Sequence, residues 1–501
     1  MRVLIVGSGA REHALAKLFM DSTMLSRIYV FADYLNPGLK RETEKTGGSI
    51  VIMNTNNAET VREKAKEVNP DLIVIGGEEP LFMGVSDALR EEGFFVFGAS
   101  RKNAMIEQSK VFARSFMWRN EIPGRLFFQA FKDLSEAEEF MKYAGDVVVK
   151  PARQAGGKGV RVIRDTKAYL SEEKSSVKMK VAEDVYKQLS GYDDIDYKIL
   201  LEQRAEGVEY TLHVISDGFY SIPLPIIQDH AHAFEYDIGP ETGGMGCISG
   251  PGMYPPFLTK EEFNKTKEIV EKVLENLKKE TKEPYVGVLA GQMMLTWVWG
   301  PTVIEFYSRF GDPEISALLP LVEGDFLEFV DKASREKLSS ASLKFKDDVS
   351  VVVKAIAPLG YPLYRNEASN HPITIDEKKI RNLGCEALYG SVEQKDGKML
   401  TKGSRAIEIV CYDSKYEVAY EKSEKASNLI EAEDGWPLFY RSDIGSLSMI
   451  RERTKVAERM RRAYKYREKK GLLGEFFVWL PEKGIISNPL LGFKKVSESE
   501  K

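Results

Sequence analysis

The sequence is poor in the residues that build metal and redox centres. Its 501 residues include only three cysteines and five histidines. Cys247, Cys385 and Cys411 are scattered without the spacing of metal ligands, and the histidines form no HxxxH pair. The pattern gives no support for a structural metal site, and it fits a protein of a reduced, cytoplasmic environment.

The chain also lacks a long apolar run and an excess of positive charge. Without about 18 consecutive apolar residues no membrane span is expected, and residues 1–7 begin directly with a strand pattern rather than a signal peptide. The formal net charge is −5, which gives no reason to expect nucleic acid or an anionic membrane as partner. We therefore expect the local basic clusters to serve small molecules.

The composition that remains, 43% hydrophobic and 29% charged, is that of a soluble globular protein of about three or four domains. The first domain, residues 1–103, opens with a strand over 2–9, a glycine turn and a helix over 10–20, and further strands are predicted at 28–32, 71–76 and 94–98. Ligands of such α/β sheets bind at the carboxyl ends of the strands. Gly7-x-Gly9 suggests a dinucleotide, but Glu12 stands where a third glycine is required, so a dehydrogenase is a minor alternative.

The second domain, residues 104–345, carries a lysine-bracketed glycine loop in a smaller lobe of about 122–216. A predicted strand ends in Lys150, and the run G-G-K-G at 156–159 precedes a second strand over 160–164. The loop amides and the two lysines suit the oxygens of a phosphate group, and a flexible hairpin is the alternative. The loop is not a P-loop, because Val160 stands where a metal-binding hydroxyl is needed.

Two further segments are rich in charged residues and glycine. A strand over 303–307 leads into Arg309, Asp312 and Glu314, for which an exposed acidic turn is the alternative interpretation. Residues 228–246 contain two histidines and the run G-G-M-G. Because no third metal ligand follows at a suitable spacing, we expect His230 and His232 to contact substrate or lie on the surface. The glycine run predicts an anion-binding turn, with a bare turn as the alternative.

A third domain, α+β in pattern, is expected over residues 346–446, with strands at 351–356 and 405–411 and a helix over 416–432. Residues 447–501 form a basic extension that is predicted to be helical over 451–470. We interpret this extension as a solvated appendage or an oligomer contact.

Taken together, six motifs resemble one known family. They are G-S-G-A-R-E-H-A-L from Gly7, G-x-E-x-P-L from Gly76, the loop from Lys150, Q-D-H from Gln228, G-P-x-T-G-G-M-G from Gly239 and I-E-F-x-x-R-F-G-D-P-E from Ile304. This order is similar to that of the phosphoribosylamine–glycine ligases, which are ATP-grasp enzymes of purine biosynthesis. The resemblance implies an α/β and α+β fold with a Rossmann-like N-terminal domain, a two-lobed ATP-grasp domain and a β-rich C-terminal domain.

The resemblance also implies ligands and site residues. The substrates would be ATP, glycine and 5-phosphoribosylamine, with two ions of Mg²⁺ or Mn²⁺, and the protein would be a cytoplasmic monomer or small homo-oligomer. Arg309, Asp312 and Lys158 would be catalytic. ATP would lie against Lys150, Gly156, Gly157, Lys158, Gly159, Glu202, Gln203, Ala205 and Glu209. The substrates would lie against Gly7, Gly9, Glu78, Asp229, Gly243, Gly244, Gly246, Arg309 and Gly311, and the metal against Gln292, Glu305 and Tyr307.

Two positions depart from the family pattern. Tyr307 replaces the usual metal-binding asparagine, and Ala231-His232 replaces a Lys-Arg pair. A neutral phenol is a poor ligand for Mg²⁺, so a paralogue that binds ATP without turnover is one alternative. Another ATP-grasp ligase, such as a carboxylating or formate-dependent enzyme, is a second alternative.

Overall fold

The computed structural model describes residues 1–133, 147–153, 161–162, 196–475, 477–480 and 484–487, together with Ser135, Ala137, Val185, Tyr186 and Leu189. The chain forms two compact units. Unit 1 consists of residues 1–104, 210–291 and 307–455, and unit 2 consists of residues 105–209, 292–306 and 456–501.

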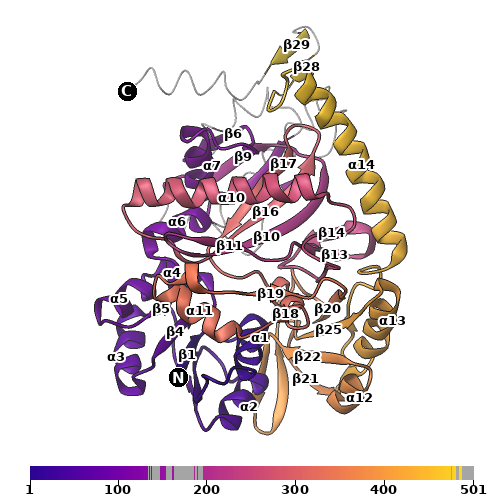
Figure 1. Ribbon diagram of the computed structural model, residues 1–501. Helices are drawn as coiled ribbons and strands as arrows, with labels where there is room; N and C mark the ends of the chain where they lie inside the picture. The colour runs from indigo at the N-terminus through magenta and orange to yellow at the C-terminus, as the bar shows by residue number, and fades with distance from the viewer. Residues whose placement is uncertain are drawn as a thin grey trace. The chain divides into compact units, whose positions relative to one another are not determined.

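Unit 1 begins with a five-stranded parallel sheet of order β3-β2-β1-β4-β5. Its strands are β1 (Arg2–Val6), β2 (Arg27–Ala32), β3 (Ile50–Ile52), β4 (Leu72–Ile75) and β5 (Val96–Phe97), and its helices are α1 (Ala10–Met20), α2 (Pro37–Lys45), α3 (Ala58–Val68), α4 (Glu78–Phe82) and α5 (Val85–Glu91). Helix α1 packs against α2, and α3 packs against α5 (Figure 1). Because β1 lies between β2 and β4, the turns after these three strands share one rim.

An antiparallel sheet forms the second layer of unit 1. From β10 onward, the order of its strands is β10-β12-β15-β20-β25-β22. The strands are β10 (Gly207–Asp217), β12 (Ile227–Asp229), β15 (Gly246–Ser249), β20 (Ser350–Pro358), β22 (Cys385–Tyr389) and β25 (Ile407–Asp413), with β11 (Ser221–Pro223) on β10 and β27 (Leu438–Phe439) on β20. Helix α13 (Tyr416–Ser427) packs on β20 and β25. Val351 and Val353 of β20 are fully buried in a core that also includes Val3 and Ile5 of β1.

Smaller elements complete unit 1. A four-stranded sheet contains β21 (Ser369–Ile375), β23 (Val392–Lys395), β24 (Lys398–Lys402) and β26 (Ile430–Ala432), and two hairpins pair β13 (His232–Phe234) with β14 (Ile238–Glu241) and β18 (Val322–Glu323) with β19 (Lys344–Phe345). The helices are α10 (Lys260–Thr281), α11 (Phe326–Ser334) and α12 (Glu377–Asn382), with short 3-10 turns η2 (Glu235–Asp237), η3 (Glu314–Leu318) and η4 (Leu338–Ser340).

The structure corrects the prediction for two cysteines. Cys385 of β22 lies directly opposite Cys411 of β25, and the two form a disulfide. This pair is not evident from the sequence, because 26 residues separate the cysteines and only the strand register brings them together. Cys247 is a free, buried cysteine.

Unit 2 is built around a four-stranded antiparallel sheet of order β6-β9-β7-β8. Its strands are β6 (Phe128–Phe131), β7 (Val147–Pro151), β8 (Arg161–Val162) and β9 (Ile199–Gln203). Helix α7 (Lys110–Arg119) follows α6 (Arg101–Gln108). The middle segment of the unit, residues 292–306, starts within β16 (Val286–Thr296) and ends within β17 (Gly300–Tyr307). Buried Val111 of α7 packs with Leu200 of β9 in a small core.

The C-terminal extension is more than a solvated appendage. Helix α14 spans Leu447–Lys469, and it buries Met449, Ile450, Ala457, Met460 and Tyr464. A hairpin of β28 (Phe477–Leu480) and β29 (Gly484–Ser487) follows it. The prediction of a basic helix is confirmed, whereas the interpretation of that helix as a solvated element is wrong.

Apolar runs also predict strands over 125–128 and 222–228, and both of these predictions need correction. Residues 222–228 do not form one strand, because Pro225 has no backbone N–H for the ladder and separates β11 from β12. The strand expected over 125–128 begins only at Phe128. In the described part of the chain, no helix has the length and apolar character needed to cross a bilayer.

Candidate active site

A cavity of about 420 Å³ opens at the rim of the parallel sheet in unit 1. The turns after β1, β2 and β4 form one side of it, and residues 390–391 and 404–408 form another. The lining residues are Gly7, Ser8, Gly9, Ala10, Arg11, Glu12, Asp33, Tyr34, Thr55, Asn56, Gly77, Glu78, Glu79, Pro80, Asp312, Arg365, Gly390, Ser391, Ser404, Arg405 and Glu408. The cavity therefore gathers arginines and carboxylates at the edge where α/β sheets bind ligands.

Glu12 explains why the first glycine turn is not a dinucleotide site. Its carboxylate accepts a 2.5 Å hydrogen bond from the backbone N–H of Gly9, and burial raises its pKa. A Cβ atom added to Gly76 would lie 2.1 Å from Oε1 of Glu12, and one added to Gly7 would lie 2.6 Å from its Cδ. The two glycines thus make room for the Glu12 side chain, which occupies the space above the turn.

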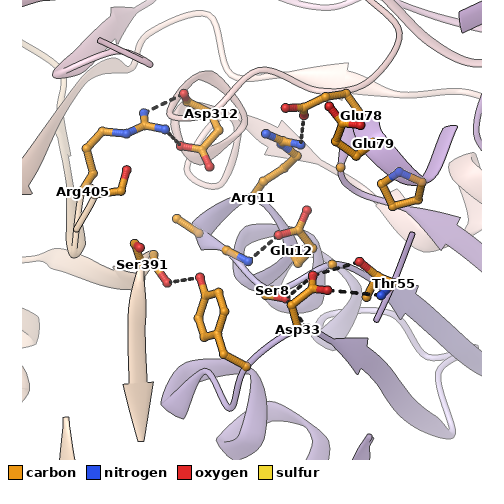
Figure 2. A pocket seen from close by; sticks show the side chains of 18 of the residues that line it. Ser8, Arg11, Glu12, Asp33, Thr55, Glu78, Glu79, Asp312, Ser391 and Arg405 are labelled. Atoms are coloured by element: carbon orange, nitrogen blue, oxygen red, sulfur yellow. Dashed lines mark hydrogen bonds and ion pairs between the residues drawn. The ribbon is translucent and has the colours of Figure 1, made fainter. Parts of the chain in front are cut away.

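Asp33 lies on the same side of the cavity, in the turn after β2. Its carboxylate accepts hydrogen bonds from Thr55 Oγ1 at 2.8 Å and from Ser8 Oγ at 3.3 Å, as Figure 2 shows. The backbone N–H of Asp33 in turn donates to Ser8 Oγ at 2.7 Å. The end of β2 is therefore fixed to the turn after β1.

Glu78 lies between two arginines. Arg11 Nη1 donates to the carbonyl of Gly76 at 2.7 Å and lies 3.4 Å from Glu78 Oε2, and Arg309 Nε lies 3.3 Å from the same oxygen. Burial acts to raise the pKa of Glu78, but Arg309 and Arg11 outweigh it and lower that pKa to about 2. Glu78 is thus a carboxylate at neutral pH, and it holds both guanidinium groups.

Arg405 joins the loop after β17 to the glycine-rich segment before β15. Its Nη1 donates to the carbonyls of Gly243 and Gly244, each at 2.9 Å, and to the carbonyl of Asp312 at 2.7 Å. Its Nη2 pairs with Asp312 Oδ1 at 2.9 Å (Figure 2). Burial acts to raise the pKa of Asp312, but Arg405 and Arg11 outweigh it and lower that pKa to about 2.

Glu408 is the buried neighbour of Asp312. Ser316 Oγ donates a 2.5 Å hydrogen bond to Glu408 Oε2. Burial and the nearby charge of Asp312 raise the pKa of Glu408 well above its ordinary value. The pKa values of these two neighbouring carboxyl groups are therefore shifted in opposite directions, down for Asp312 and up for Glu408.

The predicted glycines have steric reasons for being glycine. A Cβ atom on Gly244, whose φ is +107°, would lie 2.5 Å from Asp229 Oδ1, and one on Gly246 would lie 2.2 Å from the carbonyl of Val353. A Cβ atom on Gly311 would lie 2.3 Å from Glu314. The structure thus packs Asp229 against Gly244, and the backbone approaches its neighbours too closely for any side chain at the three positions.

His230 and His232 do not form a metal pair or a surface patch. His230 is buried, with Nε2 at 2.9 Å from Met449 Sδ and Nδ1 at 3.3 Å from the carbonyl of Gly246. Nδ1 of His232 lies 3.1 Å from the carbonyl of Gly239. The expectation of substrate contact or plain surface is therefore wrong for His230, because α14 covers it.

A second group of charged residues lies in unit 2. Lys150 Nζ is 2.9 Å from Glu202 Oε2 and 3.9 Å from Glu305 Oε1, and Lys110 Nζ is 3.5 Å from Glu305 Oε1. Arg114 forms a short ion pair with Glu202. All five side chains are at most 12% exposed, so we call them the buried charge cluster.

Burial acts to raise the pKa of Glu202, but Arg114 and Lys150 lower it to about 2. Burial lowers the pKa of Lys110. The cluster thus contains three cationic side chains and two carboxylates, and such a surplus of positive charge suits a polyanion such as a nucleotide phosphate chain.

Other predicted residues are placed as follows. Glu202 and Gln203 end β9, Ala205 lies in the loop before β10, and Glu209 is on β10. Gln292 is on β16. Glu305 and Tyr307, two residues apart, are on the same face of β17. Gly156, Gly157, Lys158 and Gly159 lie outside the described residues. Among the residues that are described, no three His, Cys, Asp or Glu side chains are grouped as metal ligands.

The predicted site residues do not include Arg11, Asp33, Arg405 and Glu408 of the cavity, or Lys110 and Arg114 of the buried charge cluster. Arg11 and Asp33 had a local signal, because each follows the end of a predicted parallel strand. Arg405 and the two α7 residues had none, because only the tertiary fold brings them to their partners.

Comparison with solved structures shows the fold of the chain. Phosphoribosylamine–glycine ligase from Thermotoga maritima superimposes with a TM-score of 0.70 and 24% identity, covering 88% of this chain and 100% of that one. The biotin carboxylase domain of Hydrogenobacter thermophilus 2-oxoglutarate carboxylase gives a TM-score of 0.66 and 15% identity, covering 95% and 98%. The chain therefore shares the fold of these two enzymes.

Sequence comparison then gives the family. The phosphoribosylglycinamide synthetase models match in order, the N domain over residues 1–107, the ATP-grasp (A) domain over 108–315 and the C domain over 351–447. Phosphoribosylamine–glycine ligase of Methanopyrus kandleri is 40% identical over 464 residues, covering 92% of this chain and 99% of the relative, and that of Pyrococcus horikoshii is 36% identical over 461 residues, covering 92% and 98%. The chain belongs to the phosphoribosylglycinamide synthetase family, which confirms the predicted family and fold class.

Proposed function

We propose that the protein uses ATP to join the carboxylate of glycine to the amine of 5-phosphoribosylamine, giving glycinamide ribonucleotide, ADP and phosphate. A carboxylate is a poor electrophile. A glycine oxygen therefore attacks the γ-phosphorus of ATP, ADP leaves, and glycyl phosphate forms. The amine nitrogen then attacks the acyl carbon, phosphate leaves, and the nitrogen loses a proton.

The cavity in unit 1 supports this proposal because it offers opposite charges at separate points. Arg11, Arg365 and Arg405 suit the phosphate of the ribose substrate, and the carboxylates of Asp33 and Glu78 suit its hydroxyl groups. Gly7 and Gly9 line the same cavity at the start of α1. This combination, in a chain of this family, is the observation that carries the assignment.

We place the glycine substrate beside the segments that Arg405 hydrogen-bonds, which are residues 243–244 and the loop at Asp312. Asp229 would bind the glycine amino group, and the backbone at Gly243, Gly244, Gly246 and Gly311 would surround the small substrate. Arg309, held by Glu78, would stabilise the transferring phosphoryl group, and Asp312, held by Arg405, would lie beside the acyl phosphate. Such positioning of charge is the main contribution a protein makes to phosphoryl transfer.

We assign ATP to unit 2. Lys150, with Lys158 and Gly156, Gly157 and Gly159 of the adjoining loop, would bind its phosphates, and Glu202, Gln203, Ala205 and Glu209 would lie by the adenine and ribose. Glu305, whose side chain is 12% exposed, would supply a carboxylate oxygen, and Gln292 would add an amide oxygen. One or two protein oxygens are sufficient for Mg²⁺ that is also bound by nucleotide phosphates, so the residues present fit Mg²⁺ or Mn²⁺ without Tyr307 as a ligand. The ion would neutralise charge on the phosphates.

A phosphate-release assay tests the assignment. Release should require ATP, Mg²⁺, glycine and freshly prepared phosphoribosylamine, and omission of any one should abolish it. Release with bicarbonate or formate in place of glycine would instead identify another ATP-grasp ligase. ATP binding without release under any condition would identify a non-catalytic paralogue.

A further inference from the structure

The segment between β12 and β15 forms a hairpin whose two ends reach the proposed glycine site. We call residues 230–246 the site hairpin. Its base is closed by backbone hydrogen bonds from Thr242 N to Ala231 O at 2.7 Å and from Met245 N to His230 O at 2.8 Å. Asp229 precedes the hairpin, and Gly244 near its other end packs against Asp229.

The tip of the site hairpin has an unfavourable backbone conformation. Tyr236 and Asp237 have φ values of +59° and +58°, and neither is glycine. A left-handed conformation is unfavourable for a residue with a side chain. The side chain of Tyr236 lies in solvent, being 82% exposed, so its own packing does not compensate this cost. Contacts from outside the hairpin must therefore stabilise the tip.

The first set of these contacts comes from residues 441–443. Arg441 is fully buried, and its Nη1 lies 3.0 Å from Asp237 Oδ1 and 3.1 Å from the carbonyl of His232. The same guanidinium forms two hydrogen bonds with Asp443, whose Oδ2 accepts from the backbone N–H of Tyr236 at 3.0 Å. Residues 441–443 thus bind the hairpin from within the stretch that the family C domain model covers.

The second set comes from α14, which begins where that model ends at residue 447. Arg453 forms a short ion pair with Asp237 Oδ2, the oxygen that Arg441 does not use. Met449 Sδ lies 2.9 Å from His230 Nε2 at the base of the hairpin. One side of α14 therefore contacts the hairpin at its tip and at its base.

The path from the hairpin to the cavity is short. Arg405, which lines the cavity, donates to the carbonyls of Gly243 and Gly244 and to Asp312. A shift of the hairpin would move these carbonyls relative to Arg405. We propose that Arg453, acting through Asp237, is a positioning residue for the glycine site, and that α14 is thereby a functional part of the enzyme. This inference rests on the proposed function.

Kinetics of full-length variants test the inference. Arg453→Ala should raise the KM for glycine at least about tenfold, while the KM for ATP stays within about twofold, because no ATP ligand moves. Arg453→Lys should recover part of the loss. The double variant Arg453→Ala/Asp237→Asn should be no worse than Asp237→Asn alone, because both changes remove the same interaction.

Arg451→Ala is the matched control, since Arg451 is an exposed arginine two positions earlier on α14. It should leave all constants unchanged. An Arg453→Ala enzyme with wild-type constants would overturn the inference. So would a fall in kcat that tracks a loss of folded protein with both KM values unchanged, because that result describes a structural role alone.

Hydrogen exchange gives a readout that does not depend on turnover. In Arg453→Ala, or in Arg453→Lys if the alanine variant does not fold, the amide of Thr242 should exchange faster than in wild type. Amides in β1 should exchange at the wild-type rate. Unchanged exchange at Thr242 would contradict the inference. A wild-type enzyme that lacks glycine-dependent turnover would instead refute the proposed function, so the two failures are distinguishable.

Discussion

Tyr307 is the residue at which this chain departs most clearly from the pattern expected for the metal site. The guanidinium of Arg309 lies 4.4 Å from the centre of its ring. A cation over an aromatic face is attracted by roughly 0.5–2 kcal/mol, depending on exposure. Arg309 is also held by Glu78, so ring and carboxylate together fix the guanidinium. We interpret Tyr307 as a support for Arg309 and not as a metal ligand.

We expect Tyr307→Phe to keep kcat/KM within about twofold of wild type, because the phenylalanine ring retains the face over which Arg309 lies. Tyr307→Ala should lower kcat, since Arg309 loses this support. Steady-state assays at saturating ATP and Mg²⁺ check both variants. Loss of turnover in Tyr307→Phe with intact ATP binding would show that the hydroxyl has a direct role in metal binding or catalysis.

Glu202 predicts a pH dependence of stability. Its pKa is lowered to about 2 in the folded protein from an ordinary value of 4.5, and its side chain is 1% exposed. A group with a lowered folded pKa stabilises the protein above its unfolded pKa, and the stabilisation is lost as pH falls towards the folded pKa. The two values correspond to a contribution of about 3 kcal/mol at neutral pH.

Glu202→Gln should therefore lower the thermal unfolding midpoint at pH 7, and the difference from wild type should shrink between pH 5 and pH 2. Parallel melting curves at several pH values measure this. Glu206→Gln is the control, because Glu206 is 57% exposed and its ion pair with Arg204 contributes little. A difference from wild type that stays constant with pH would show that the Glu202 charge is not stabilising.

At the residue scale, the sequence predicted the residues with local signatures. Glu78, Asp312 and Arg309 follow strand ends, and the structure brings Glu78 together with Arg309 and Asp312 into the cavity region. Arg405 was missed because its three carbonyl and carboxylate partners lie 93 to 162 residues away in sequence. No periodicity or spacing reports contacts over such separations.

Among the elements, α14 differs most from its prediction. The sequence of residues 451–470 is so basic that a solvated helix was expected, yet every third or fourth residue is buried: Ala457, Met460 and Tyr464. Tyr464 is fully buried, with its ring atoms 3.4 Å from the position of a Cβ on Gly300. Arg467 lies over the ring of Trp297. A narrow apolar stripe was thus sufficient to bury one side of a charged helix.

Removing the Tyr464 ring should create a cavity. We expect Tyr464→Ala to destabilise the protein by about 3 kcal/mol, because truncation of a fully buried aromatic side chain loses its burial and leaves unfilled space. Tyr466→Ala, two positions later and 62% exposed in wild type, should change stability by less than about 0.5 kcal/mol. Denaturant unfolding of both variants gives the comparison. Equal effects would show that this part of α14 does not pack on unit 2.

Strand prediction succeeded where apolar runs were continuous and failed where the chain was irregular. The strands β4 and β20 lie within two residues of their predicted bounds, and β1 begins at the predicted residue and ends three residues early. The run at residues 222–228 looked like one strand because its apolar residues are continuous, but Pro225 interrupts the ladder. The disulfide between Cys385 and Cys411 depends on the pairing of β22 with β25, and pairing is a tertiary property that a single sequence does not show.

For the whole molecule, the order of motifs along the chain was the most informative signal. Each glycine or charge cluster has a plain structural alternative when considered alone. Their succession from Gly7 to Glu314 matches the succession of family domains over residues 1–107 and 108–315. The domain boundaries and the roles of the single residues remain predictions.

The central claim is that the glycine carboxylate takes the γ-phosphoryl group of ATP. Turnover of glycine labelled with ¹⁸O in both carboxylate oxygens tests this most directly, because the oxygen that attacks phosphorus leaves with it when the amine displaces phosphate. The account predicts one ¹⁸O atom in each released phosphate and one in the amide carbonyl of the product, as measured by mass spectrometry. Release of unlabelled phosphate during product formation would contradict the glycyl phosphate intermediate and, with it, the proposed mechanism.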